Sequence, residues 1–381
     1  SASDPTLGNI TFDELVPLFA EQARALVEGG VDVLLIETSQ DILEVKAAIF
    51  GCREAIAEAD RPVALQVQVT LDTSGRMLLG TDIGAALVTL EALHADVIGL
   101  NCSTGPEHMR QAVRYLSENC TVPISIIPNA GIPHNEAGCA VYPLQPTPFA
   151  EQLEEFAMDF GVSVVGGCCG TTPEHLRQLV ERLAGRAPPT REVQRVPRLS
   201  SAIRATDLVQ VPAPTMFGER VNAQGSRKVK RHLLEDDYDG VLEVAREQVD
   251  GGAHVLDVCV ALTERQDESD QMRTVVKLLS QGVDAPLCID STEAGVIDTA
   301  LKQSPGRAVV NSINLENGRE RIDAVLPLVA AHGAAVIALT IDRDLGGMAK
   351  TAETKLEVAR KIHRVATEEY GLEPDALIFD A

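Results

Sequence analysis

Two adjacent cysteines, Cys168 and Cys169, stand between a short apolar run and the helix start Thr172-Pro173. Glycines flank the pair on both sides and leave the backbone free to turn there. A third cysteine, Cys102, follows another apolar run, so it also stands at the end of a predicted strand. Three thiolates with one open position are typical of a catalytic zinc site, whereas a structural site usually has four protein ligands. The pattern therefore favours a zinc site that accepts a substrate atom as its fourth ligand.

Two further roles for these thiols stay open. Free cysteine is commonly buried as a small apolar side chain, and a vicinal disulfide is possible, although strained. We expect Cys52 and Cys288 in the core, Cys120 and Cys139 in loops, and His175 on the surface beside the thiols. The irregular spacing of the eight cysteines argues against a disulfide framework and indicates a reducing, cytoplasmic environment.

The second half of the chain carries carboxylates and amides at its predicted strand ends. They are Glu219, Asn222, Asp257, Asp290, Asn311 and Asp342. A buried flat heterocycle with N–H donors and carbonyl acceptors needs such partners along its edges. Carboxylates would equally suit Mg²⁺, and a single Asp or Asn at a strand end often only caps the next helix. For so many at one end of a sheet, a binding site is the better interpretation.

Both halves alternate short apolar runs with amphipathic stretches, which predicts βαβ units and parallel sheets. Polar residues at successive strand ends favour a barrel mouth over the edge of an open sheet. About five strands can be recognised in the first half and about six in the second, fewer than the eight of a complete barrel. We therefore predict an α/β protein with two (β/α)₈ TIM-type barrels in tandem, each incomplete, in a chain truncated at both ends.

The predicted domains are residues 1–186 and 215–381, joined by a proline-rich linker at 187–214. The net charge of −23 argues against binding to nucleic acid or to anionic membranes. The absence of tryptophan makes a base-stacking surface improbable. No apolar run is long enough for a transmembrane helix, so we expect none.

The first half resembles the zinc-dependent, homocysteine-binding S-methyltransferase family in segments 99–102, 128–131 and 166–173. The resemblance implies that zinc is held by Cys102, Cys168 and Cys169 and that the thiol of homocysteine takes the open position. It also implies that Asn129 fills this position before the substrate arrives, and that Glu37 and Asn101 help to bind homocysteine. A free thiol has a pKa of about 8.5, but a metal-bound thiol is deprotonated outright, so zinc would create the nucleophile.

The second half resembles the pterin-binding family shared by methyltetrahydrofolate methyltransferases and dihydropteroate synthase, in segments 218–222, 257–258, 289–291 and 311–313. The resemblance implies that the pterin ring is hydrogen-bonded by Asp257, Asp290, Asn311 and Asp342, with Glu219 and Asn222 nearby. One position departs from the family: Cys259 stands where an asparagine is usual. A further asparagine of the family pattern would come after the sixth strand, beyond the last residue of this sequence.

Together the two halves resemble the N-terminal half of the cobalamin-dependent methionine synthase family. The resemblance implies methyl transfer from 5-methyltetrahydrofolate to homocysteine through methylcobalamin. Since no Asp-x-His-x-x-Gly pattern occurs here, the cobalamin would be bound by a domain outside this chain. Two alternatives remain: a homocysteine S-methyltransferase with another methyl donor, and a fragment that binds zinc or pterin without turnover.

Overall fold

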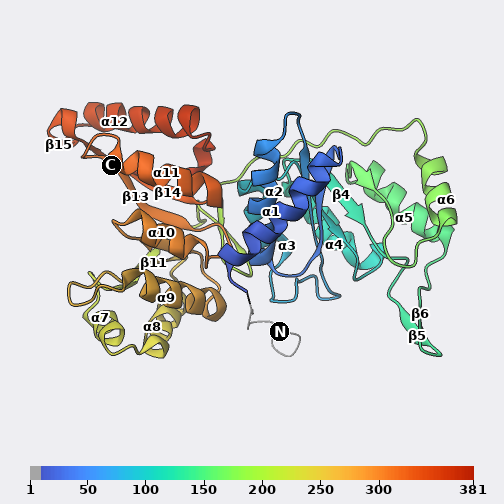
Figure 1. Ribbon diagram of the computed structural model, residues 1–381, viewed down its shortest axis with the longest axis horizontal. Coiled ribbons are helices and arrows are strands. Elements are labelled where there is room, and N and C mark those ends of the chain that lie inside the picture. Colours follow the sequence, from blue (N-terminus) through green and yellow to red (C-terminus); the bar gives the residue numbers. More distant parts are fainter. Residues whose placement is uncertain (1–9) are drawn as a thin grey trace. The chain divides into compact units, whose positions relative to one another are not determined.

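The computed structural model describes residues 10–381, and the chain divides into two compact units between Arg195 and Val196. In each unit a largely parallel sheet alternates with helices along the chain (Figure 1). The predicted α/β class is therefore confirmed. Within residues 10–381, no helix is both long and apolar enough to cross a membrane.

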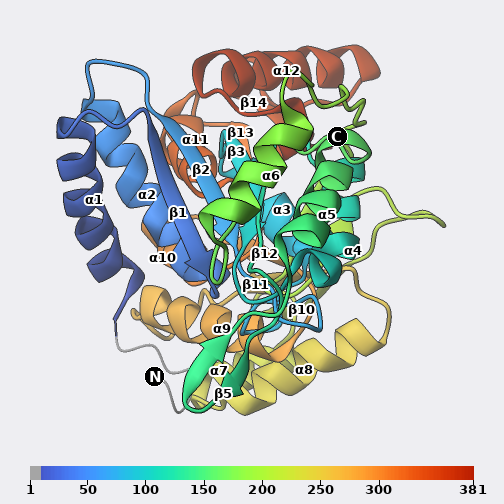
Figure 2. The same ribbon diagram turned by 90° about the vertical axis from the view of Figure 1, so that its right-hand side faces the viewer.

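The first unit contains a parallel sheet with the strand order β1-β2-β3-β4-β7. Its strands are β1 (Val33–Ser39), β2 (Ala64–Val69), β3 (Val97–Asn101), β4 (Ile124–Ile127) and β7 (Val164–Val165). Its helices are α1 (Phe12–Glu28), α2 (Ile42–Glu58), α3 (Ile83–Ala92), α4 (Pro106–Asn119), α5 (Pro146–Met158) and α6 (Pro173–Leu183). Figure 2 shows α1 and α2 beside β1, and α5 next to α6.

Local sequence explains where several of these helices begin. Thr11 forms a capping box with Glu14 at the start of α1, as its spacing predicts. Thr172 is the N-cap of α6, and Pro173 occupies the first helical turn, where a missing N–H costs nothing. The thiol pair therefore lies directly between β7 and a well-defined helix N-terminus.

The second unit is built around a sheet with the order β10-β11-β12-β13-β14, in which β16 pairs with β14 in parallel and β15 pairs with β14 antiparallel. Its strands are β10 (Phe217–Asn222), β11 (Val255–Cys259), β12 (Leu287–Asp290), β13 (Val309–Leu315), β14 (Ala335–Asp342), β15 (Gly347–Met348) and β16 (Leu377–Asp380). Its helices are α7 (Arg227–Leu234), α8 (Tyr238–Asp250), α9 (Glu268–Gly282), α10 (Ala294–Leu301), α11 (Glu320–His332) and α12 (Ala352–Arg364), the last extended by a π-helical turn (Val365–Glu369).

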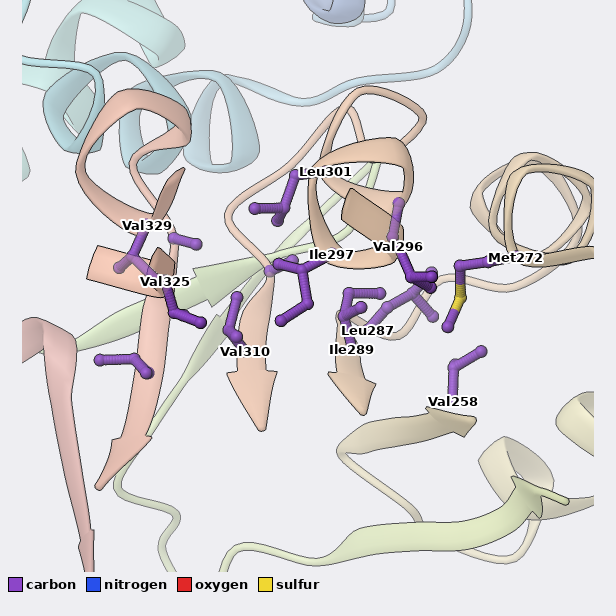
Figure 3. Packing of buried hydrophobic residues seen from close by; sticks show 14 of the residues in the cluster. Val258, Met272, Leu287, Ile289, Val296, Ile297, Leu301, Val310, Val325 and Val329 are labelled. Atoms are coloured by element: carbon purple, nitrogen blue, oxygen red, sulfur yellow. The ribbon is translucent and has the colours of Figure 1, made fainter. Parts of the chain in front are cut away.

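The two faces of the second sheet are packed differently. One face meets the helices: Val258, Ile289 and Val310 pack against residues of α9, α10 and α11 (Figure 3). On the opposite face, Val255, Cys288 and Val309 form a separate buried cluster with Leu199 and Ala335. Because side chains alternate along a strand, the residues two positions further on share this second face. Those residues are Asp257, Asp290 and Asn311, so the polar positions lie above an apolar layer at the carboxyl ends of the strands.

Two hairpins were not predicted from the sequence, since their strands are too short to show alternation. The first joins β5 (His134–Glu136) to β6 (Cys139–Val141) in a segment expected to be a loop, so the loop assignment of Cys139 is wrong. Cys120, also assigned to a loop, is fully buried at the end of α4.

The second hairpin, β8 (Arg198–Ser200) with β9 (Ala205–Asp207), lies inside the segment expected to be a linker. Leu199 is buried against the second sheet, and the backbone N–H of Ser200 donates to the carbonyl oxygen of Arg307. The residues from Val196 onward therefore pack with the second unit.

Candidate functional site

The structure brings together the three thiols that the sequence singled out. The sulfur of Cys169 lies 3.8 Å from that of Cys102 and 3.8 Å from that of Cys168. All three sulfurs lie within 4.8 Å of one another, and within residues 10–381 no other group of His, Cys, Asp and Glu side chains meets the same criterion. A tetrahedral zinc with Zn–S bonds of about 2.3 Å places its sulfurs about 3.8 Å apart. Two of the three sulfur separations therefore have the value that a tetrahedral zinc ion requires.

Backbone hydrogen bonds join the three strand-end loops that carry this cluster. The N–H of Cys102 donates to the carbonyl oxygen of Ile127 at the end of β4 (3.1 Å). The N–H of Cys168 donates to Pro128 O (2.8 Å), and the N–H of Ala130 donates to Cys169 O (2.9 Å). The loop after β4 therefore holds the loops after β3 and β7 in register.

Cys102 adopts a left-handed backbone conformation, with φ of +61°, and the next residue, Ser103, has φ of +63°. This conformation is uncommon for residues other than glycine and often marks functional sites. Here it turns the chain sharply after β3, so the Cys102 thiol reaches those of Cys168 and Cys169. Cys102 and Cys168 are half-buried and Cys169 is exposed, which leaves the cluster open to a ligand.

Two buried asparagines brace the cluster. The side-chain oxygen of Asn129 accepts a hydrogen bond of 3.1 Å from the backbone N–H of Cys169. Asn101 exchanges two hydrogen bonds with Thr38: its oxygen accepts from Thr38 N–H and its amide donates to Thr38 Oγ1, both at 2.8 Å. The roles that the resemblance gives these residues, ligand for Asn129 and substrate contact for Asn101, stay predictions.

Glu37, at the end of β1, is exposed and lines a cavity of about 460 Å³ beside α1 and α2. The described residues that line this cavity do not include the three cysteines. Glu37 is nevertheless connected to the thiol cluster, because it precedes Thr38, which is bonded to Asn101, the residue before Cys102. A role for Glu37 in binding homocysteine stays a prediction.

His175 is buried, so the expected surface position is wrong. Its Nδ1 accepts a hydrogen bond from Thr172 N–H (3.2 Å), and its Nε2 lies 2.9 Å from the carbonyl oxygen of Leu144. The ring therefore caps α6 and holds the chain segment that follows β6. A Thr-x-x-His spacing at the helix start was the available signal for this role.

The environment of Cys168 favours its protonated thiol in the absence of a metal. Burial, and next the nearby charge of Cys102, raise the pKa of Cys168 to about 12. Burial also raises the pKa of Tyr142, and the nearby Cys169 thiol is the next cause. Tyr142 is a site residue that the cysteine spacing does not reveal, because it lies outside the cysteine motifs and only the hairpin before it carries it to the cluster.

In the second unit, the structure brings together three of the predicted pterin-binding side chains. The amide nitrogen of Asn222 donates to Asp257 Oδ2 at 2.7 Å and to Asp290 Oδ2 at 2.8 Å. Burial, and next the charge of Asp257, raise the pKa of Asp290. The other oxygen of Asp257 is buried and has no hydrogen-bond partner among the described residues. A buried acceptor of this kind favours a ligand that supplies an N–H donor.

The remaining predicted residues of this site lie in different environments. Asp342 is buried and forms an ion pair with Lys361 of α12, with an N–O distance of 2.7 Å. Although burial alone would raise the pKa of Asp342, its bonds to Lys361 and to the N–H of Asp344 outweigh this effect and lower it. Asn311 is half-buried and pairs in register with Asp290, whereas Glu219 is exposed.

Two cations near these carboxylates were not predicted from the sequence. Arg321 of α11 donates to the carbonyl oxygens of Ser291, Thr292 and Ser312, and so joins the loops after β12 and β13. Lys361 lies on an amphipathic helix, where its spacing does not distinguish it from other surface lysines. Both residues reach the site only through the packing of helices that follow the strands.

Cys259 ends β11 and is buried, and burial raises the pKa of its thiol to about 11. A protonated thiol is a weak hydrogen-bonding group compared with the asparagine expected at this position. The second site therefore offers carboxylates and the amide of Asn222, with a neutral thiol beside them.

Comparison with known families agrees with this division of the chain. Residues 1–183 match the sequence profile of the homocysteine S-methyltransferase family. Residues 218–381 match the profile of the pterin binding enzyme family.

The chain is similar over almost its whole length to curated methionine synthases. It is 42% identical over 384 aligned residues to methionine synthase of Mycobacterium leprae (strain TN), covering 99% of this chain and 32% of that protein. It is 40% identical over 379 residues to methionine synthase of Mycobacterium tuberculosis (strain ATCC 25618 / H37Rv), with the same coverages. The chain thus spans about a third of the length of the curated relatives it matches.

Solved structures that align with about half of this chain are less similar to it in sequence. The apo homocysteine methyltransferase MmuM from Escherichia coli is 22% identical with a TM-score of 0.37, covering 46% of this chain and 58% of that one. A Yersinia pestis dihydropteroate synthase bound to a pterin-sulfa conjugate is 20% identical with a TM-score of 0.36, covering 48% of this chain and 63% of that one.

Proposed function

We propose that this chain forms the two substrate-binding units of a methionine synthase, because residues 1–183 match the profile of the homocysteine S-methyltransferase family and residues 218–381 that of the pterin binding enzyme family. The first unit binds homocysteine and the second binds 5-methyltetrahydrofolate. In the whole protein we expect methylcobalamin, bound outside this chain, as the methyl carrier. The observation that carries the proposal is the three-thiol cluster, in which the sulfur of Cys169 lies 3.8 Å from the sulfurs of both Cys102 and Cys168.

The donor set of the first unit fits zinc. Three cysteine sulfurs within 4.8 Å of one another are soft ligands, and the exposure of Cys169 leaves room for a fourth ligand. Cys102, Cys168 and Cys169 would hold the ion, and zinc, when bound, lowers the pKa of a thiol that coordinates it. The thiolate of homocysteine would then be the nucleophile that accepts the methyl group.

The chain's own residues position this substrate. Asn129 and the backbone bonds between loops fix the cysteines, of which Cys169 is exposed to solvent. Glu37 would accept a hydrogen bond from the substrate amino group, as the family resemblance implies. Thr38 and Asn101 hold the end of β1 beside Cys102 and so set the distance between the two ends of the substrate.

The second unit is suited to a flat heterocycle. Asp257 and Asp290 present carboxylate oxygens at neighbouring strand ends, and the unpaired oxygen of Asp257 can accept from the amino-pyrimidine edge of a pterin. Asn222 separates the two carboxylates and reduces their mutual repulsion. Asn311 and Asp342 complete the rim, and Glu219 stands at its exposed side.

We also propose that each sheet is part of a (β/α)₈ barrel, with residues 187–214 joining the two. Support comes from the parallel strand order and from the packing of helices on one face of the second sheet, while its other face carries the polar site. In a doubly wound sheet, helices would cover both faces.

Metal analysis combined with X-ray absorption tests the function of the first unit. We expect about one zinc per chain with three sulfur neighbours, and four after L-homocysteine is added. Cys168→Ser should lose most of the zinc, whereas Cys139→Ser, which alters an exposed cysteine outside the cluster, should keep it. The proposal would be overturned if wild-type protein purified under reducing conditions did not bind zinc. It would also be overturned if L-homocysteine added no sulfur neighbour to the zinc.

Calorimetric titration with 5-methyltetrahydrofolate tests the second unit independently. Asp257→Ala should weaken binding at least about tenfold, because a lost charged hydrogen bond is worth about 1.5–3 kcal/mol. Asp270→Ala, which removes an exposed carboxylate in α9, serves as the control. Equal affinities of these two variants would argue against a pterin site at Asp257.

A further inference from the structure

We infer that Arg321 is a positioning residue of the second site: its guanidinium fixes the backbone directly after Asp290 and Asn311 and so holds these two side chains ready for the pterin ring. The inference rests on the pterin site of the proposed function and adds a residue from outside the strand-end motifs. Arg321 lies in the first turn of α11, the helix that follows β13.

Three hydrogen bonds of Arg321 end on backbone carbonyl oxygens of two different loops. Its Nε donates to the oxygen of Ser312 in β13 (2.9 Å). Its two terminal nitrogens donate to the oxygens of Thr292 (2.6 Å) and Ser291 (2.7 Å), directly after β12. A guanidinium is planar and presents its N–H donors in a fixed fork. One side chain therefore holds the ends of two neighbouring strands at a set separation.

The bonded carbonyls belong to the residues that follow the two polar side chains. Asp290 ends β12 and pairs in register with Asn311 of β13. The register of β13 with β14 shifts between Asn311 and Ile313, so Ser312 is an extra residue there. Such a bulge leaves the extra residue unpaired and changes the direction of nearby side chains. The bond from Arg321 to Ser312 thus fixes the backbone at an irregular point beside Asn311.

The packing of α11 brings the guanidinium to this place. Val325 and Val329 follow Arg321 at intervals of four residues, so the three share one face of the helix. Both valines are buried in the cluster that includes Val310 of β13 (Figure 3). Arg321 is one turn nearer to the start of the helix, where the chain has just left the carboxyl end of β13. The face that packs on the sheet therefore also directs Arg321 toward the strand ends.

A cation is unfavourable at this position unless its hydrogen bonds compensate. The first turn of a helix is the positive end of the helix dipole. Arg321 is also half-buried, and burial lowers its pKa, because a charged group loses solvation there. The three carbonyl bonds offset these costs. A small polar side chain could stabilise the helix start without them, but it could not connect the two loops.

Calorimetric titration of the full chain with 5-methyltetrahydrofolate tests the inference on Arg321→Ala and Arg321→Lys. Arg321→Ala removes the charge and the bonds. Arg321→Lys keeps the charge, but one compact ammonium group cannot replace a planar fork across two loops. We expect both variants to bind about 5- to 100-fold more weakly than wild type, because Asp290 and Asn311 must then be ordered when the ligand binds.

Hydrogen exchange of the ligand-free chain separates positioning from a general loss of stability. The amides of residues 291–293 and 311–314 should exchange faster in both Arg321 variants, whereas those of β11 should exchange as in wild type. Arg319→Ala is the matched control, because this exposed arginine bonds to the carboxylates of Asp323 and Glu369 instead. It should bind 5-methyltetrahydrofolate and exchange at both loops like wild type.

Wild-type affinity in either Arg321 variant would overturn the inference and leave the pterin site standing. Weaker binding with unchanged exchange at both loops would also overturn it, since the arginine would then not act by fixing them. If Arg321→Ala does not fold, Arg321→Lys decides by the same two measurements. A wild-type chain that does not bind 5-methyltetrahydrofolate would overturn the proposed function of the second unit together with the inference.

Discussion

The side-chain oxygen of Asn129 accepts a hydrogen bond from the backbone N–H of Cys169, across 3.1 Å. This bond joins the loop after β4 to the loop that carries two of the three thiols. The family resemblance gives the same oxygen to zinc before substrate arrives, and a carbonyl oxygen has two lone pairs, so both uses are compatible. Loss of the Asn129 side chain should therefore affect both the thiol cluster and the stability of the fold.

Asn129→Ala should lower the free energy of unfolding by about 1–3 kcal/mol, because the Cys169 N–H loses its acceptor in a partly buried place. Zinc affinity should fall as well, since Cys169 is no longer fixed. Urea unfolding and chelator competition measure the two effects. Asn129→Asp, which keeps an acceptor oxygen, should retain most of the stability; an equal loss in both variants would contradict the role of this bond.

Gly170→Ala should be more harmful than Gly138→Ala, although both glycines have positive φ, of +78° and +87°. A Cβ at Gly138 meets no described atom within 4 Å, so only backbone strain of about 1–3 kcal/mol is expected there. At Gly170 the overlap with Tyr142 is added, and zinc affinity should fall only in this variant. Thermal unfolding and zinc titration of the pair check this, and indistinguishable variants would show that the contact is unimportant.

Asp290→Asn should change the pH dependence of stability in a defined direction. Burial raises the pKa of Asp290 in the folded state, so its ionised form destabilises the fold. This penalty is absent below the unfolded pKa and grows as pH rises through the folded pKa. The variant should therefore gain stability relative to wild type between acid and neutral pH, as measured by urea unfolding.

Asp298→Asn is the control for that series, with the opposite sign. The hydrogen bond from His332 lowers the pKa of Asp298, so its contribution is present above the unfolded pKa and lost as pH falls through the folded value. This variant should lose stability at neutral pH and approach wild type in acid. The same trend in both variants would show that the pKa shifts are assigned wrongly.

Lys361→Met should leave Asp342 as a buried carboxylate without its ion pair. Removing one partner of a buried pair costs about 3–5 kcal/mol, but the Lys361 side chain is 46% exposed, so about 1–2 kcal/mol is expected. Because Lys361 helps to lower the pKa of Asp342, the loss should shrink as pH falls through that pKa. Unfolding at several pH values measures it, with Lys355→Met on the same helix as control; a loss independent of pH would contradict the role of the ion pair.

Local sequence was sufficient for most of the scaffold. Caps such as Thr11 and Thr172 mark where α1 and α6 begin, and an amphipathic period indicates that these segments are helical. The predicted strands of both sheets are present, although β7 is shorter than its apolar run suggests. Three-residue strands such as β5 and β8 carry too little pattern to be recognised.

The sequence by itself determined that Cys102, Cys168 and Cys169 end strands of one parallel sheet, and that carboxylates end the strands of another. This follows from the short-range pattern of apolar residues and from the glycine and proline residues that mark turns. Only the tertiary structure decided that the sulfur of Cys169 lies 3.8 Å from those of Cys102 and Cys168, that Asn222 bridges two carboxylates, and which residues support each site. The contacts of Tyr142, His175 and Lys361 depend on how loops and helices pack against the end of a sheet. Spacing along the chain does not specify this packing.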